Sequence, residues 1–174
     1  MGNFNDFGST FSRNNAYNGG AIYLNGCDSV FEGSIFDNNF AHDFGGAIYA
    51  LNSRIDVSSN FTLNHVEKST GGAMYIKNSK AHVKSNFDHN HANDYSSSNT
   101  GGAIGIADSN VTVCSNFTGN SAYFVGAAIQ VQNSNLTVTE SRFVKNRLYS
   151  SNSYGGAIYS INCPIFIVEN SYLL

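Results

Sequence analysis

The sequence predicts an all-β protein, a right-handed, single-stranded parallel β-helix (β-solenoid) with three short strands per coil and about six to seven coils. Two motifs, Gly-Gly-Ala-Ile and Phe-x-x-Asn, alternate six times at a period near 26 residues. A repeat of this length is one supersecondary unit that cannot bury its apolar face alone, so stacked units must share a core. Apolar residues alternate with polar ones over short runs, as in strands, and the abundant Asn, Ser and Gly favour turns over helix interiors.

Each unit begins with Gly-Gly, or with Gly126-Ala127 in the fifth unit, and continues through three short strands. In the second full unit we expect strands at residues 47–50, 54–57 and 59–61, with a turn at 51–53. A loop of variable length then leads to the next unit. We expect residues 1–174 to form one such array, uncapped at both ends. Uncapped ends indicate either head-to-tail stacking of unpaired strands or a piece of a longer surface protein from which the neighbouring coils are missing. The units start near Gly19, Gly45, Gly71, Gly101, Gly126 and Gly155.

Alignment of the units on Phe-x-x-Asn predicts columns of like residues along the solenoid axis. The steps between successive motifs are 25, 25, 26, 30 and 26 residues. A serine stands two residues before each phenylalanine and can bond to the next coil. We expect a core ladder of stacked rings, which gain stability beyond plain burial, at Phe11, Phe36, Phe61, Phe87, Phe117 and Phe143, then Tyr172. We expect asparagine, which tolerates a left-handed backbone, at a tight corner of each coil: Asn14, Asn39, Asn64, Asn90, Asn120 and Asn146.

The recurring residues therefore have structural roles, and none is a catalytic signature. Gly-Gly permits a sharp bend and a close approach of two backbones. A nucleotide-binding loop would need spaced glycines between a strand and a helix, whereas these glycines are adjacent and precede a strand.

Composition and charge exclude several classes of protein. The net charge is −3 with few charged residues, so a basic footprint for nucleic acid is absent. No apolar run is long enough to span a membrane, and the first residues lack the pattern of a signal peptide.

Cys27 and Cys163 fall in the same phase of the repeat but five coils apart, too far for a disulfide, and Cys114 lies in another phase. We expect small buried thiols.

Four Asn-x-Ser/Thr sequons occur, and each precedes a residue expected to point inward. Each asparagine should then point outward, where a glycan could be attached if the chain is secreted by a eukaryote. These candidate N-glycosylation sites are Asn60, Asn110, Asn116 and Asn135.

Candidate chemical groups are sparse. A polysaccharide-cleaving enzyme would need at least two carboxylates together on one face, and the columns predict at most a surface pair of Asp56 with His82. His65 and His91 should be neighbours in adjacent coils, but two imidazoles without a third ligand favour surface turn residues over a metal site. We therefore expect no catalytic residues, no metal and no cofactor.

An outward column of tyrosines is the best surface feature of the sequence. Stacking of such rings stabilises a sheet face without any ligand, but an exposed aromatic strip can also bind a glycan or a protein. The strip comprises Tyr23, Tyr49, Tyr75 and Tyr159. The two longest loops, at residues 93–100 and 147–154, emerge at one corner of the coil, where insertions often form a binding face.

The alternating Gly-Gly-Ala-Ile and Phe-x-x-Asn motifs resemble the repeats of the chlamydial polymorphic outer membrane proteins and related repeats in large surface proteins of some protists. The resemblance runs from about Phe11 to Tyr172. It implies a right-handed parallel β-helix displayed outside the cell, with an adhesive or surface-structural role.

We therefore expect a non-enzymatic structural β-solenoid, extracellular or at the cell surface, that builds a fibre or appendage by end-to-end stacking. The alternative is a cell-surface adhesin, similar to an autotransporter passenger, that binds host or neighbouring cells. A carbohydrate-active β-helix enzyme is the third reading. The expected partners are further copies of the chain or a cell-surface protein or glycan, with no nucleic acid and no membrane span.

Overall fold

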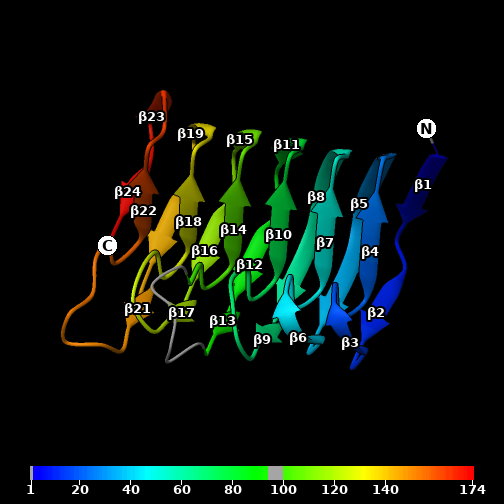
Figure 1. Cartoon of the computed structure of the whole chain (residues 1–174), viewed down its shortest axis with the longest axis horizontal. Helices are drawn as coiled ribbons and strands as arrows, with labels where there is room; N and C mark the ends of the chain where they lie inside the picture. Colours follow the sequence, from blue (N-terminus) through cyan, green and yellow to red (C-terminus); the bar gives the residue numbers. More distant parts are fainter. Residues whose placement is uncertain (1, 94–99) are drawn as a thin grey trace.

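The computed structural model describes residues 2–93 and 100–174, which form a parallel β-solenoid with three faces (Figure 1). The described residues contain strands and turns and no helix. Each coil passes in turn through three sheets, which we name C, A and B, and the two termini lie at opposite ends of the stack. The predicted fold class, with three strands per coil and about six turns, is confirmed.

The strands of each sheet follow the order of the coils. Sheet C contains β4 (Ile22–Asn25), β7 (Ile48–Leu51), β10 (Met74–Lys77), β14 (Ile104–Ala107), β18 (Ile129–Gln132) and β22 (Ile158–Ile161). Sheet B contains β3 (Asn15–Asn18), β6 (Phe40–Phe44), β9 (His65–Val66), β13 (His91–Ala92), β17 (Ser121–Ala122) and β21 (Arg147–Leu148). Sheet A contains β1 (Gly2–Phe7), β2 (Thr10–Ser12), β5 (Cys27–Asp37), β8 (Arg54–Thr62), β11 (Lys80–Val83), β12 (Asn86–Asp88), β15 (Asn110–Val113), β16 (Asn116–Thr118), β19 (Asn135–Thr139), β20 (Arg142–Val144), β23 (Ile165–Glu169) and β24 (Tyr172–Leu173).

The phenylalanines of the motif lie in one buried column of sheet A. Neighbouring rings stack at centroid distances of 4.7 to 4.9 Å, close to the spacing of adjacent strands. The column ends at Leu173, which pairs with Phe143, and not at Tyr172 as the alignment predicted. Ser171 keeps its place in the serine column by accepting the Ser141 N–H, so the residue two positions later is Leu173.

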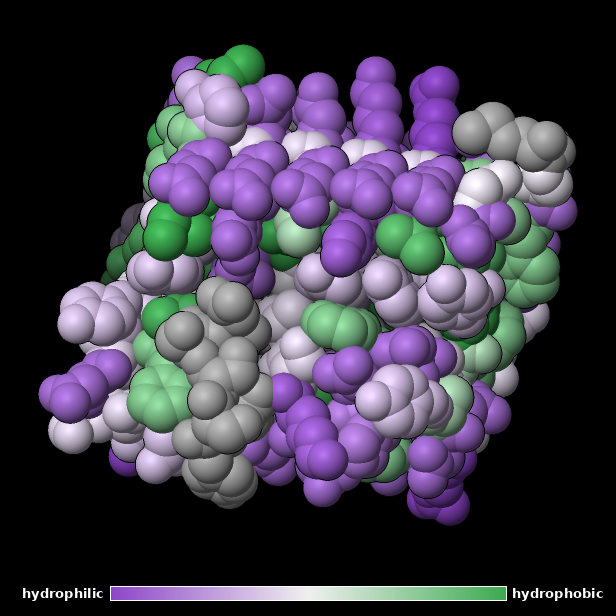
Figure 2. Space-filling model, viewed as in Figure 1, coloured by the Kyte–Doolittle hydropathy of each residue, from purple (hydrophilic) through white to green (hydrophobic). Residues whose placement is uncertain are grey.

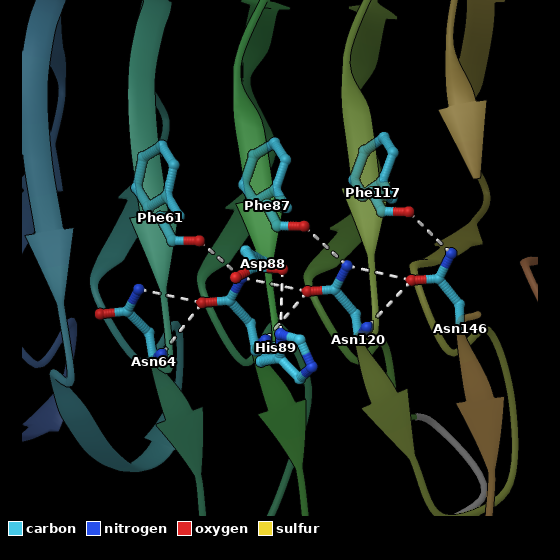
Figure 3. A network of polar contacts seen from close by, with 9 residues as sticks. Phe61, Asn64, Phe87, Asp88, His89, Phe117, Asn120 and Asn146 are labelled. Atoms are coloured by element: carbon cyan, nitrogen blue, oxygen red, sulfur yellow. Dashed lines mark hydrogen bonds and ion pairs between the residues drawn. The ribbon is translucent and has the colours of Figure 1, made fainter. Parts of the chain in front are cut away.

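The motif asparagines form a buried ladder of amides (Figure 3). Oδ1 of Asn90 accepts the backbone N–H and the Nδ2 group of Asn64, both at 3.0 Å. Nδ2 of Asn90 donates to the Phe61 carbonyl at 2.9 Å and to Oδ1 of Asn120 at 3.0 Å. Each interior amide thus uses both acceptor positions and both donor hydrogens, which no other side chain of this size can do.

The ladder changes the interpretation of the corner. The left-handed backbone belongs to the residue before each asparagine, including Leu63 and His89 with φ of 56° and 51°. The expectation that the motif asparagine itself takes this conformation is therefore wrong. Asparagine stands at this position because its amide pairs with the coils on either side.

Serines form two further ladders. In the expected one, each backbone N–H donates to the serine hydroxyl of the next coil, from Ser34 through to Ser171. The second follows the turn between sheets C and A, where Cys27 donates to Ser53 and the pattern continues to Ser134. Cys27 and Cys163 are half-buried free thiols.

The two glycines of each Gly-Gly pair meet different requirements. The first has a positive φ in most units, 62° at Gly45 and 76° at Gly71. The second has no room for a side chain, because a Cβ on Gly72 would lie 2.1 Å from the carbonyl oxygen of Gly102 in the next coil. The pair therefore permits both the bend and the contact between stacked coils.

Candidate functional surfaces

Three acidic side chains of the described residues each pair with a single histidine. Asp56 contacts His82 at 3.3 Å, Glu67 contacts His42 at 3.3 Å, and Asp88 contacts His89 at 2.9 Å. Within residues 2–93 and 100–174, no three His, Cys, Asp or Glu side chains gather closely enough to hold a metal ion. The same residues include no helix long and apolar enough to cross a membrane.

The tyrosine column on sheet C is mostly covered. Tyr23, Tyr49 and Tyr75 are register partners in adjacent coils, as expected. However, Tyr49 and Tyr75 are only 8% and 7% exposed, since the ring of Phe44 stacks on Tyr75 at 4.6 Å. Burial raises the pKa of Tyr75 to about 12. These two rings therefore stabilise the face and are not part of an exposed strip.

The rest of the column is discontinuous. Thr70 occupies the space beside Gly105, where a side chain on that glycine would clash with it. Tyr159 lies beyond this gap, paired with Gln130, and is half-buried. One feature of the sequence could have indicated that the tyrosines are covered: Phe44 and Thr70 stand at equivalent positions, directly before a Gly-Gly pair.

The outer face of sheet A carries all four sequon asparagines. Asn60, Asn110 and Asn116 are exposed, whereas Asn135 is half-buried and its Oδ1 is buried without a hydrogen-bond partner among the described residues. Asn60 and Asn116 are joined through Asn86 by amide hydrogen bonds of 2.9 Å. Asn110 and Asn135 are register partners in adjacent coils, so two glycans there would start one strand spacing apart.

Sheet B presents a second aromatic surface, of which the sequence analysis predicted only the pair of His65 and His91. The ring of His65 stacks on His91 at 5.2 Å and contacts Phe40 at 4.9 Å. Burial, and then the neighbouring His65, lower the pKa of His91, so this imidazole is neutral near pH 7. The predicted proximity of the two histidines therefore holds, on the outer side of β9 and β13.

A cleft of about 300 Å³ lies at the C-terminal side of this histidine pair. It is lined by His91, Asn93, Ser121, Tyr123 and Tyr149. Ser121 and Tyr123 were not predicted as surface features. The loops that begin at Asn93 and Arg147 were predicted to form a binding corner, and residues 94–99 of the first loop lie outside the described residues.

The last coil exposes side chains that are buried in every interior coil. Phe166, Val168 and Leu173 continue the inward columns of Leu136, Val138 and Phe143, yet all three are exposed. Figure 2 shows the outer face above sheet C, where polar side chains repeat from coil to coil along one edge. The apolar surface of the end coil thus contrasts with the polar side chains along that edge.

The chain was compared with known protein families. The model of the Chlamydia polymorphic membrane protein repeat matches residues 8–25 and 33–51, which contain the first two Phe-x-x-Asn motifs and the first two Gly-Gly pairs. No curated protein and no solved structure matches the chain at a significant level.

Proposed function

We propose that this chain, which carries repeats of the Chlamydia polymorphic membrane protein type, is a non-enzymatic section of an extracellular surface rod that lengthens by end-to-end stacking. The observation that carries the proposal is the register of the coils: each coil stacks like residue on like residue and presents the same columns and edge strands, so a further coil can continue the stack in the same way. Such an edge is a template for a further parallel strand. A head-to-tail contact of this kind repeats and produces a filament.

The columns of the first coil fit this contact. Followed through the register, Phe4 shares a column with Phe166, and Phe11 shares one with Leu173. If a second copy were placed in the same register, its Phe4 would therefore stack on Phe166 and its Phe11 on Leu173. Burial of this apolar surface supplies the driving force for association.

Asp6 opposes the same contact. It lies on β1 in the column that ends at Val168, and its carboxylate accepts a hydrogen bond from the Ser34 hydroxyl. Burial alone would raise the Asp6 pKa, but hydrogen bonds from Ser34 and Ser9 together hold it below its usual value. An inward charge on an edge strand disfavours uncontrolled pairing. Replacement by Asn should therefore promote stacking, whereas Asp28→Asn, on the outer side of β5, changes the charge equally and should not.

The test is sedimentation and electron microscopy of the purified chain at increasing concentration. We expect rods, and we expect Val168→Asp to abolish them because it places a carboxylate inside the contact. Ile167→Asp is the matched control, since both side chains lie on β23 and are 39% exposed but Ile167 points outward. Dispersed monomers at high concentration, or equal loss of rods with both variants, would refute end-to-end stacking.

We propose cell adhesion through the lateral faces as the second candidate function. It rests on the cleft of sheet B, which combines aromatic rings with polar groups. Binding of the labelled chain to cells, with competition by unlabelled chain, tests this function, and the absence of saturable binding would contradict it.

A further inference from the structure

Three polar side chains of the cleft on sheet B make no hydrogen bond to another described residue. His91 and Ser121 are register partners on β13 and β17, and Asn93 follows His91 by two residues, on the same side of the chain. Among the hydrogen bonds of the described residues, none involves the side chain of Asn93, the hydroxyl of Ser121 or a ring nitrogen of His91. Ser121 is nevertheless almost fully buried at the base of the cleft. These groups are therefore available to a ligand and would gain hydrogen bonds from it.

Aromatic rings complete the walls. Tyr123 and Tyr149 lie in adjacent coils at equivalent positions, two residues after Ser121 and Arg147. The Arg147 guanidinium lies 5.6 Å from the centre of the Tyr149 ring, an interaction that helps to orient that ring. The row of Asn93, Tyr123 and Tyr149 thus offers an amide and two aromatic rings, while the neighbouring row offers the imidazole of His91 and the hydroxyl of Ser121.

We infer that this cleft binds a single pyranose ring of a cell-surface glycan. A sugar ring has one face rich in C–H groups, which packs on an aromatic ring, and an edge of hydroxyls that both donate and accept hydrogen bonds. The neutral His91, Asn93 and Ser121 match that edge because together they supply donors and acceptors without a net charge. The volume of about 300 Å³ is at the lower limit for ligand sites and suits one ring.

The inference deepens the proposed adhesive function, since it names the class of ligand. The probes are methyl glycosides of common hexoses and N-acetylhexosamines, titrated into the whole chain and followed by saturation-transfer NMR and chemical-shift changes. We expect at least one glycoside to bind with a Kd in the millimolar range and to receive saturation from tyrosine ring protons.

Two tyrosines of sheet B provide a matched pair of variants. Tyr149→Ser removes a wall of the cleft and should weaken glycoside binding at least tenfold. Tyr17→Ser removes a similarly exposed ring from the same face at the other end of the solenoid, with exposures of 63% for Tyr17 and 59% for Tyr149, and should leave binding unchanged. Asn93→Ala should weaken glycoside binding without altering the ring of Tyr149.

The outcomes separate this site from adhesion itself. Failure of every glycoside to bind, or an equal effect of the two tyrosine variants, would overturn the sugar site. Cell binding that survives Tyr149→Ser would likewise overturn the site while adhesion stands. Glycoside binding that depends on Tyr149 supports the site even if the chain fails to bind cells.

Discussion

Removal of one amide from the buried asparagine ladder should cost far more stability than removal of one from the exposed ladder. In Asn90→Ala, the backbone N–H and the Nδ2 group of Asn64 both lose their acceptor. Each buried donor left unpaired costs about 1–3 kcal/mol, so we expect a loss of about 3–5 kcal/mol in the free energy of unfolding. The Phe61 carbonyl also loses a donor in a site closed to solvent.

The matched control is Asn86→Ala. Asn86 lies on the outer face of sheet A and also makes two amide hydrogen bonds of 2.9 Å, but these are exposed and water can replace them. We expect this variant to lose less than about 1 kcal/mol. Urea unfolding followed by circular dichroism would measure both losses, with the m-values compared because a repeat array can unfold in parts.

The variant Asn90→Asp tests the same site through the pH dependence of its stability. The new carboxylate would be buried, and one of its oxygens would face the Phe61 carbonyl and Oδ1 of Asn120, which are both acceptors. We expect these two effects to outweigh the two donors that Asn64 retains and to raise the folded-state pKa above the unfolded value of about 3.9. The penalty is then full near pH 7 and disappears below about pH 3.9. The gap between the Asp and Ala variants should therefore close as the pH falls. Equal stabilities of the Asn90→Ala and Asn86→Ala variants would refute the role assigned to the buried ladder.

Three further predictions concern the backbone and the histidines. Gly72→Ala should prevent folding into a stable solenoid, whereas Gly156→Ala should be tolerated because no atom lies within 4 Å of the added Cβ; thermal unfolding separates the two, and equal stability would contradict the close-approach argument. Leu63→Asn should raise the free energy of unfolding by about 0.5–1 kcal/mol, because a left-handed backbone is costly for leucine and less so for asparagine; a loss in urea unfolding would count against it. Burial and His65 lower the pKa of His91 in the folded chain, so as the pH decreases the unfolded chain takes up this proton at a higher pH than the folded chain does, and stability should fall below about pH 6.5. Thermal unfolding of His91→Gln should show a weaker dependence of stability on pH. An unchanged pH dependence would exclude His91 as the cause.

The fold followed from the sequence because every coil repeats the same requirement. A parallel solenoid in register places each residue over its equivalent one period away, so a column read from aligned units becomes a column in space. The phenylalanine, serine and asparagine ladders are of this kind. Their positions did not depend on any contact between residues of different phase.

Contacts between different phases could not be read in this way. The burial of Tyr49 and Tyr75 depends on Phe44, which reaches over sheet C from the end of β6. The strained residue of the corner depends on the backbone path, which the composition of the motif does not reveal. The cleft of sheet B depends on two neighbouring rows of side chains, one with His91 and Ser121 and the other with Tyr123 and Tyr149, next to loops of different length.

By itself, the sequence determined the architecture, the period and the residues that stack along the axis, since strand patterning and repeat length are local properties that recur in each unit. Only the tertiary structure decided which tyrosines are exposed, which asparagine amides are buried and how the polar groups of the described residues are paired. The physical reason is that exposure and hydrogen-bond satisfaction depend on how neighbouring faces and corners cover one another. Those contacts join residues that no single repeat contains.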